Sequence, residues 1–139
     1  MSRPSVADLF ANAASNLLGC SFRLHGRRPE TGLDCVGLVL ASLDVIGRSA
    51  TGPQGYGLRN KSVDPWFDEA EYAGFRRTHE IAQRGDLLLA HVGPAQHHLA
   101  ILDTTSTIIH AHAGLRRVVR QPLEITTTVI ARWRLTDSI

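Results

Sequence analysis

The second half of the chain contains a succession of short apolar runs separated by turn residues, and this succession limits the fold more than any other feature. Runs of this length, rich in Leu, Ile, Val and Thr, predict β-strands. They are Leu87–Ala90, Leu99–Leu102, Thr107–Ile109, Arg117–Arg120 and Thr128–Trp133.

The first half instead has the apolar spacing of helices. Pro4 and Ser5 open one predicted helix that ends near Gly19. A second follows the N-cap residue Asp34 and is closed by Gly47. A third, short helix is predicted from Asp64 to about Tyr72. Helices followed by strands indicate an α+β fold, with the N-terminal helices packed on a mostly antiparallel β-sheet.

The composition fits one globular domain spanning residues 1–139. Hydrophobic residues make up 43% of the 139 residues and charged residues 20%, which are ordinary values. The net charge of +2 is too small to indicate a nucleic-acid partner. Two cysteines, Cys20 and Cys35, do not form a disulfide framework or a CxxC metal motif.

The start of the sequence lacks the features of an export signal. It reads Met-Ser-Arg-Pro-Ser-Val-Ala-Asp, without an apolar segment, and no apolar run in the chain is long enough to cross a bilayer. We therefore expect synthesis in the cytoplasm without a signal peptide and no insertion into a membrane.

Cys35 is the candidate nucleophile because it lies where a loop becomes an apolar helix. In the first turn, unpaired amides and the positive end of the helix dipole lower a thiol pKa, so we expect a reactive thiolate. A small, inert core cysteine is the alternative.

A cysteine nucleophile needs a base, and two of the seven histidines are well placed to serve it. His98 opens the strand Leu99–Leu102, and His110 ends the strand Thr107–Ile109. A spacing of twelve residues suits adjacent antiparallel strands joined by a short turn. His110 can then accept a hydrogen bond from His98 and orient its ring.

Two other interpretations of the histidines remain. Each could be a surface or core residue without a chemical role. His97, His98, His110 and His112 could also bind zinc, but adjacent strand residues face opposite sides of a sheet, so His97 and His98 cannot share a metal easily. We expect neither a metal nor another cofactor.

Several motifs together resemble the NlpC/P60 cysteine peptidases, in order and in spacing. The similarity extends from about Leu17 to Trp133 and is nearest to the short members found in phages and gene transfer agents, the phage cell wall peptidases. The motifs are Phe22-Arg23-Leu24-His25-Gly26, Leu33-Asp34-Cys35-Val36-Gly37-Leu38, Arg84-Gly85-Asp86-Leu87-Leu88-Leu89, His98-Leu99-Ala100-Ile101 and Ile108-Ile109-His110-Ala111.

The resemblance implies a papain-like fold and hydrolysis of the peptidoglycan stem peptide, commonly between D-γ-glutamyl and a diamino acid. It implies that Cys35 attacks as a thiolate, that His98 is the general acid and base, and that His110 orients His98. The Cys35 amide would stabilise the oxyanion.

Three positions are implied to lie in the substrate-binding region. Asp34 matches an aspartate associated with the free amino group of the stem peptide, although helix capping alone would explain it. Phe22 stands where the family usually has Tyr, and Val36 where it usually has Ser, so two polar contacts are missing. These two departures leave the bond that is cleaved open.

The main hypothesis is a peptidoglycan endopeptidase carried by a phage-like tail or baseplate and acting in the periplasm of the target cell. One alternative is a silent structural or hub protein of the tail tip that keeps the fold. Another is an amidase or acyltransferase that uses the same cysteine and histidine chemistry.

Overall fold

The computed structural model describes residues 4–48, 70–71, 73–93, 96–124 and 126–136. No helix in these ranges has the length and hydrophobicity needed to cross a bilayer. The helix predicted from Asp64 to Tyr72 and the glycine-rich stretch 47–61 lie almost entirely outside the described residues. The elements are α1 (Val6–Ser15), β1 (Arg27–Arg28), β2 (Gly32–Leu33), α2 (Cys35–Val45), β3 (Phe75–Arg77), β4 (Leu87–Gly93), β5 (Gln96–Leu102), β6 (Thr107–His112), β7 (Arg117–Pro122) and β8 (Thr128–Leu135).

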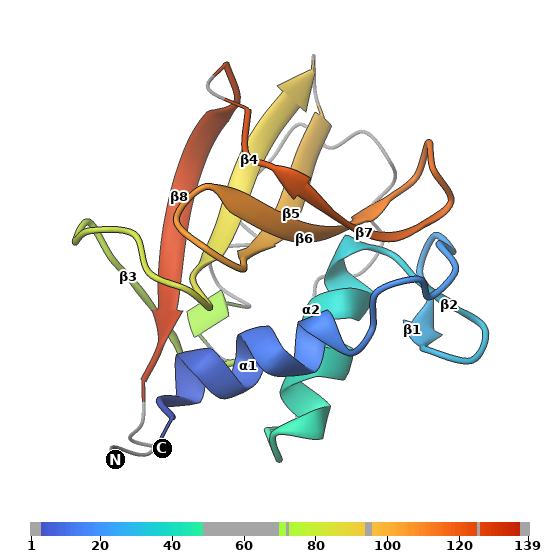
Figure 1. The fold of residues 1–139 in the computed structure, drawn as a ribbon, viewed down its shortest axis with the longest axis horizontal. Coiled ribbons are helices and arrows are strands. Elements are labelled where there is room, and N and C mark those ends of the chain that lie inside the picture. The colour runs from blue at the N-terminus through green and yellow to red at the C-terminus, as the bar shows by residue number, and fades with distance from the viewer. Residues whose placement is uncertain (1–3, 49–69, 72, 94–95, 125, 137–139) are drawn as a thin grey trace.

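Six of these strands form one sheet in the order β3-β8-β4-β5-β6-β7, and every neighbouring pair is antiparallel (Figure 1). Strands β4 to β7 follow one another as hairpins, while β8 returns to pair with β4. The predicted α+β class and the mostly antiparallel sheet are confirmed. Strand β3 and the small hairpin of β1 and β2 were not predicted.

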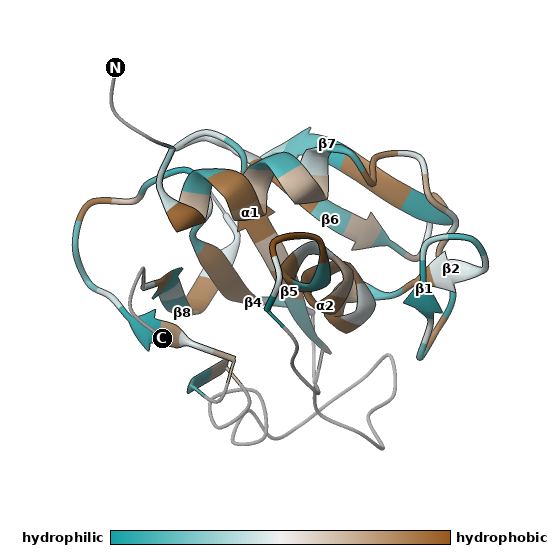
Figure 2. Ribbon diagram, turned by 90° about the horizontal axis from the view of Figure 1, so that it is seen from below, coloured by the Kyte–Doolittle hydropathy of each residue, from teal (hydrophilic) through white to brown (hydrophobic). Residues whose placement is uncertain are grey.

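The two helices lie together against one face of the sheet (Figures 1 and 2). Ser5 caps α1 by accepting a hydrogen bond from the Asp8 amide, and Asp34 caps α2 in the same way through Gly37. Between helices and sheet lies the apolar core, which removes large side chains from water and so stabilises the fold. Its fully buried members include Phe10, Leu33, Leu38, Leu43, Leu89, Ile101, Ile109 and Trp133.

The loop that precedes α2 is packed directly on the helix through two glycines. A Cβ atom at Gly37 would lie 2.0 Å from the carbonyl oxygen of Gly26, far inside van der Waals contact. Only glycine therefore allows this backbone approach, which fixes the loop beside the first turn of α2.

The motif Arg84-Gly85-Asp86 has a structural explanation. Gly85 has φ of +90°, and a Cβ there would meet the Ala7 carbonyl oxygen of α1. The buried Asp86 carboxylate accepts hydrogen bonds from Arg132 at 2.7 Å and from Arg134 at 2.8 Å, both on β8. This segment ties α1 and β8 to the start of β4.

Candidate active site

Cys35 is the first residue of α2, and this helix packs against both β5 and β6. The backbone amides of Leu99, Val36 and Cys35 itself favour the thiolate and act to lower the pKa of the thiol. Leu99 directly follows His98 in β5, so the thiol lies beside the strand segment that carries the predicted base. Its side chain is partly buried against the core.

The protonation state of Cys35 differs from the sequence expectation. Burial raises the pKa of the thiol to about 12, although the three amides act in the opposite direction and the Asp34 charge adds to the rise. The predicted lowering by the helix N-terminus is therefore wrong for the free protein, because loss of hydration costs the thiolate more than the amides return. The Cys35 thiol is therefore neutral in the free protein near physiological pH.

His98 and His110 form a hydrogen-bonded pair. The Nε2 atom of His98 lies 2.7 Å from Nδ1 of His110, and the two rings meet edge to face. They come from adjacent antiparallel strands joined, as predicted, by a short turn, which begins at Asp103, in the register Ile101↔Ile109. Their places along the strands were predicted wrongly: His98 is the third residue of β5 and His110 the fourth of β6, because both strands are longer than their apolar runs.

Both imidazoles are neutral near physiological pH. Burial lowers the pKa of His98 to about 3, and the neighbouring His110 and His112 add to this effect. Burial also lowers the pKa of His110. A neutral imidazole keeps a lone pair that can accept a proton, which a general base requires.

Gln121 on β7 forms a hydrogen bond with the histidine pair, and it was not predicted from the sequence. Its Oε1 atom lies 2.7 Å from Nε2 of His110. Residue 121 faces Ile108 across the β6–β7 ladder, two residues from His110 on the same side of β6. Such diagonal neighbours lie within reach of long side chains. The sequence does show a polar residue, Gln121, in the predicted strand region of β7. Placing it next to His110 required the register of β6 and β7.

His97 and His112 follow the alternation of sides along their strands. His97 stacks near His91 with ring centroids 5.4 Å apart, on the side of β5 opposite to His98. His112 lies on the same side as His110, again with centroids 5.4 Å apart. In the part of the chain that the structure describes, no group of three or more His, Cys, Asp or Glu side chains could hold a metal ion.

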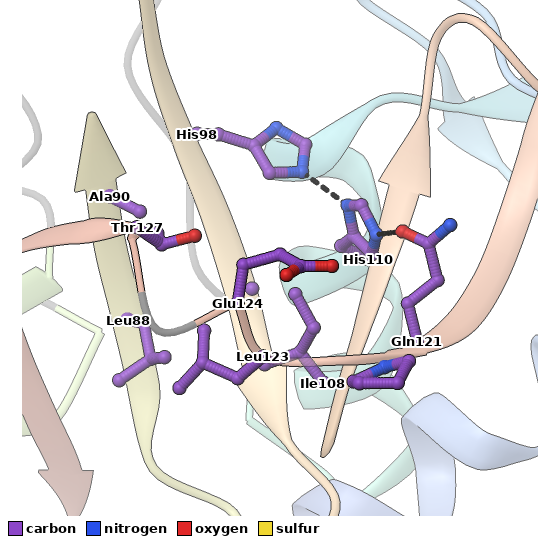
Figure 3. A pocket seen from close by; sticks show the side chains of 11 residues that line it. Leu88, Ala90, His98, Ile108, His110, Gln121, Leu123, Glu124 and Thr127 are labelled. Carbon is purple, nitrogen blue, oxygen red and sulfur yellow. Dashed lines mark hydrogen bonds between the residues drawn. The ribbon is translucent and has the colours of Figure 1, made fainter. Parts of the chain in front are cut away.

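A cavity of about 240 Å³ opens beside the histidine pair (Figure 3). His98, His110 and Gln121 line one part of it. The remaining wall is mostly apolar and comes from β4, β5, β6, the last residue of β7 and the segment after it: Leu88, Ala90, Ala100, Ile108, Pro122, Leu123, Glu124 and Thr127.

Asp34 is only 2% exposed, and both of its carboxylate oxygens are engaged within the protein. Oδ1 accepts hydrogen bonds from the Gly37 amide at 2.8 Å and from Arg27 at 3.0 Å, and Oδ2 accepts one from the His25 amide at 2.8 Å. The capping role is confirmed. Binding of a substrate amine by Asp34 stays a prediction, and a competing amine would have to displace Arg27.

Val36 and Phe22 also stay predictions as substrate-binding residues. Val36 is 2% exposed and belongs to the core, so a contact with substrate would require it to leave that environment. Phe22 is partly buried against the core and bridges to Leu33, next to the start of α2. Neither side chain offers a hydrogen-bonding group at the site.

Together, the fold and the site define an α+β domain with a cysteine at a helix N-terminus, close to the backbone of Leu99 in β5, and a hydrogen-bonded histidine pair on β5 and β6 of an antiparallel sheet. A family model described as the NlpC/P60 family matches residues 19–128. The chain therefore belongs to the NlpC/P60 family. Among curated protein sequences, no match was found.

Solved structures share this fold at low sequence identity. NlpC2 from Trichomonas vaginalis is similar with a TM-score of 0.70 and 17% identity, covering 96% of this chain and 48% of its own. RipB, described as a peptidoglycan hydrolase from Mycobacterium tuberculosis, has a TM-score of 0.66 and 18% identity, covering 94% and 65%. The NlpC/p60 domain of the peptidoglycan hydrolase SagA has a TM-score of 0.63 and 23% identity, covering 91% and 96%.

The chain thus spans about half the length of the Trichomonas vaginalis protein NlpC2 that it matches. At these identities, the structural likeness establishes the fold.

Proposed function

We propose that the protein is a cysteine endopeptidase that cleaves the stem peptide of peptidoglycan, between D-γ-glutamyl and a diamino acid. The observation that carries this proposal is the hydrogen-bonded pair of His98 and His110 in β5 and β6. The Cys35 thiol lies close to the backbone amide of Leu99, the residue that follows His98. Membership of the NlpC/P60 family and the similarity of the fold to two peptidoglycan hydrolases support the substrate class.

The reaction begins with a neutral thiol and a neutral imidazole. His98 accepts the Cys35 proton as the sulfur attacks the carbonyl carbon, which gives a tetrahedral oxyanion and an imidazolium. The amides at the start of α2 are donors for that oxyanion. His98 then gives its proton to the leaving amine, and the C–N bond breaks to leave a thioester on Cys35.

Water completes the cycle. His98 removes a proton from a water molecule that attacks the thioester, and the thiol of Cys35 is restored as the acid product leaves. His110 keeps the His98 ring in place through both steps. The cavity beside the pair provides space for part of the substrate next to the base.

Purified muropeptides with defined stems test the bond directly. Incubation with the protein, followed by mass spectrometry, should show addition of one water and separation of a disaccharide dipeptide from a peptide that begins with the diamino acid. Cleavage of another amide would contradict the proposed cleavage site and agree with the amidase alternative. No cleavage of any muropeptide, with an established hydrolase active on the same samples, would favour the silent structural protein and contradict the proposal.

We also propose that the protein acts from a phage-like tail or baseplate, in the periplasm of the target cell. The support is the similarity of its motifs to the short phage and gene transfer agent members of the family. Tail and baseplate genes beside its gene, and the protein in purified particles by mass spectrometry, are the expected observations. A gene among cell-division or secretion genes, with no protein in particles, would contradict this role.

A further inference from the structure

Two hydrogen bonds in series join Gln121, His110 and His98 (Figure 3). The first joins Oε1 of Gln121 to Nε2 of His110 at 2.7 Å. The second joins Nδ1 of His110 to Nε2 of His98, also at 2.7 Å. Three strand positions, on β7, β6 and β5, therefore form one polar line along the edge of the cavity.

The chemistry of the groups gives this line a direction. An amide oxygen only accepts hydrogen bonds, so Nε2 of His110 must carry a hydrogen. A neutral imidazole has one N–H, so Nδ1 of His110 is an acceptor and Nε2 of His98 must donate to it. The hydrogen of His98 is then on Nε2, and its lone pair is on Nδ1.

This lone pair is the one that the reaction needs. Nε2 of His98 is already engaged with His110, so Nδ1 is the ring nitrogen left for the proton of Cys35. If the Gln121 amide were reversed, its NH₂ group would donate to His110, His110 would donate to His98, and His98 would carry its hydrogen on Nδ1. A base protonated on that nitrogen cannot take the thiol proton.

We propose that Gln121 is a positioning residue that sets the tautomers of His110 and His98, so that the free nitrogen of His98 is available to Cys35. The tautomer assignment stands on the two hydrogen bonds between neutral rings, while its consequence for catalysis rests on the proposed peptidase function. Gln121 acts through His110 and does not touch the reacting atoms.

The surroundings of the line support the assignment. His110 is 8% exposed, so water competes little for its ring nitrogens. Burial lowers the pKa of His98 and of His110, which keeps both rings neutral and gives each a single N–H. The hydrogen bond from His110 to Gln121 favours the protonated ring but does not overcome burial. Register holds Gln121 in place, because it pairs with Ile108 beside His110.

Nuclear magnetic resonance of ¹⁵N-labelled protein tests the tautomers without any substrate. Long-range ¹H–¹⁵N correlations distinguish an imidazole with hydrogen on Nδ1 from one with hydrogen on Nε2. In the unsubstituted protein at pH 7, we expect hydrogen on Nε2 in both His98 and His110. Hydrogen on Nδ1 of either ring would overturn the inference.

Gln121→Met removes the acceptor and keeps the length of the side chain. We expect the His110 signals to change to a mixture of tautomers or to the Nδ1–H form. We also expect kcat to fall by about tenfold or more, up to the 10²–10⁴-fold that general acid–base catalysis contributes in full. The matched control is Gln83→Met, at an exposed turn position, which should change neither. Unchanged tautomers in Gln121→Met would overturn the inference.

Gln121→Glu keeps an acceptor but adds a negative charge that favours a protonated His110. A protonated ring donates from both nitrogens and reverses the bond to His98, so the acid limb of the kcat profile should move to higher pH, with activity retained at alkaline pH. A variant that merely perturbed packing would lose activity evenly across pH, and that result would contradict the inference. If the unsubstituted protein cleaves no peptide but shows both Nε2–H tautomers, the proposed function fails and the tautomer assignment stands.

Discussion

The Nε2 atom of His98 and the Nδ1 atom of His110 lie 2.7 Å apart, although twelve residues and a turn separate them in the chain. The antiparallel pairing of β5 and β6 creates this contact. It leaves Nδ1 of His98 without a part in this hydrogen bond, and in the proposed mechanism this nitrogen takes the proton of Cys35. The backbone amide of Leu99, the next residue of the same strand, favours the Cys35 thiolate.

Replacing His98 should remove the base and leave the fold. For His98→Ala, we expect kcat on a muropeptide to fall by about 10²–10⁴-fold, the usual contribution of general acid–base catalysis. His110→Ala should cost less, because it removes only the orientation of the base. Steady-state kinetics measures both, with the exposed His79→Ala as the matched control. If kcat falls no more in His98→Ala than in His79→Ala, the assignment of His98 as the base is contradicted.

The sequence contained enough to predict the fold class and the pairing of the two histidines. Strand-like runs and a spacing of twelve residues sufficed, because antiparallel strands joined by a short turn place such residues together. The role of Gln121 could not be predicted, since it depends on the register of β6 and β7. The thiol pKa was predicted in the wrong direction, because hydration of Cys35 depends on how closely β5 covers the helix start.

The stability of the protein should fall as the pH drops below about 6.5. The folded pKa of His98 is about 3, below the unfolded value of about 6.5, so this group stabilises the fold fully above 6.5 and progressively less as pH falls towards 3. Between pH 7.5 and 5.5, the loss from His98 should be about 1 kcal/mol. The lowered pKa of His110 acts in the same direction.

Urea unfolding at the two pH values measures this loss. His98→Gln, which removes the buried titrating group, should lose about 1 kcal/mol less than the unsubstituted protein over the same interval. Equal losses in the two proteins would show that His98 titrates normally in the fold.

The thiol of Cys35 should react slowly with alkylating reagents in the free protein. With a pKa of about 12, the thiolate fraction, and with it the iodoacetamide rate, should rise without a plateau up to pH 9. Urea-denatured protein is the control, because its thiols should approach a plateau near their ordinary pKa of about 8.5. Peptide mapping by mass spectrometry separates Cys35 from Cys20. A plateau of the Cys35 rate near pH 7 in folded protein would contradict the neutral thiol.

Gly37→Ala should destabilise the protein although it places a better helix former in α2. Alanine ordinarily stabilises a helix by about 1 kcal/mol relative to glycine. Here its Cβ would lie 2.0 Å from the Gly26 carbonyl oxygen, so the loop before α2 must move. The control Gly47→Ala meets no atom within 4 Å and carries only the strain of its φ of +82°, about 1 kcal/mol.

Urea unfolding should therefore show a larger loss for Gly37→Ala than for Gly47→Ala. A Gly37→Ala protein as stable as the unsubstituted one would mean that the close approach of the two backbones does not exist.

The most direct test of the nucleophile is the release of amino groups from purified Gram-negative sacculi by the unsubstituted protein and by Cys35→Ala. Cys20→Ala is the matched control, and circular dichroism establishes that all three proteins are folded. We expect a steady increase of new amino termini with the unsubstituted protein and with Cys20→Ala, and none above background with Cys35→Ala. Equal release by Cys35→Ala, or no release by the unsubstituted protein beside an active control hydrolase, would contradict it.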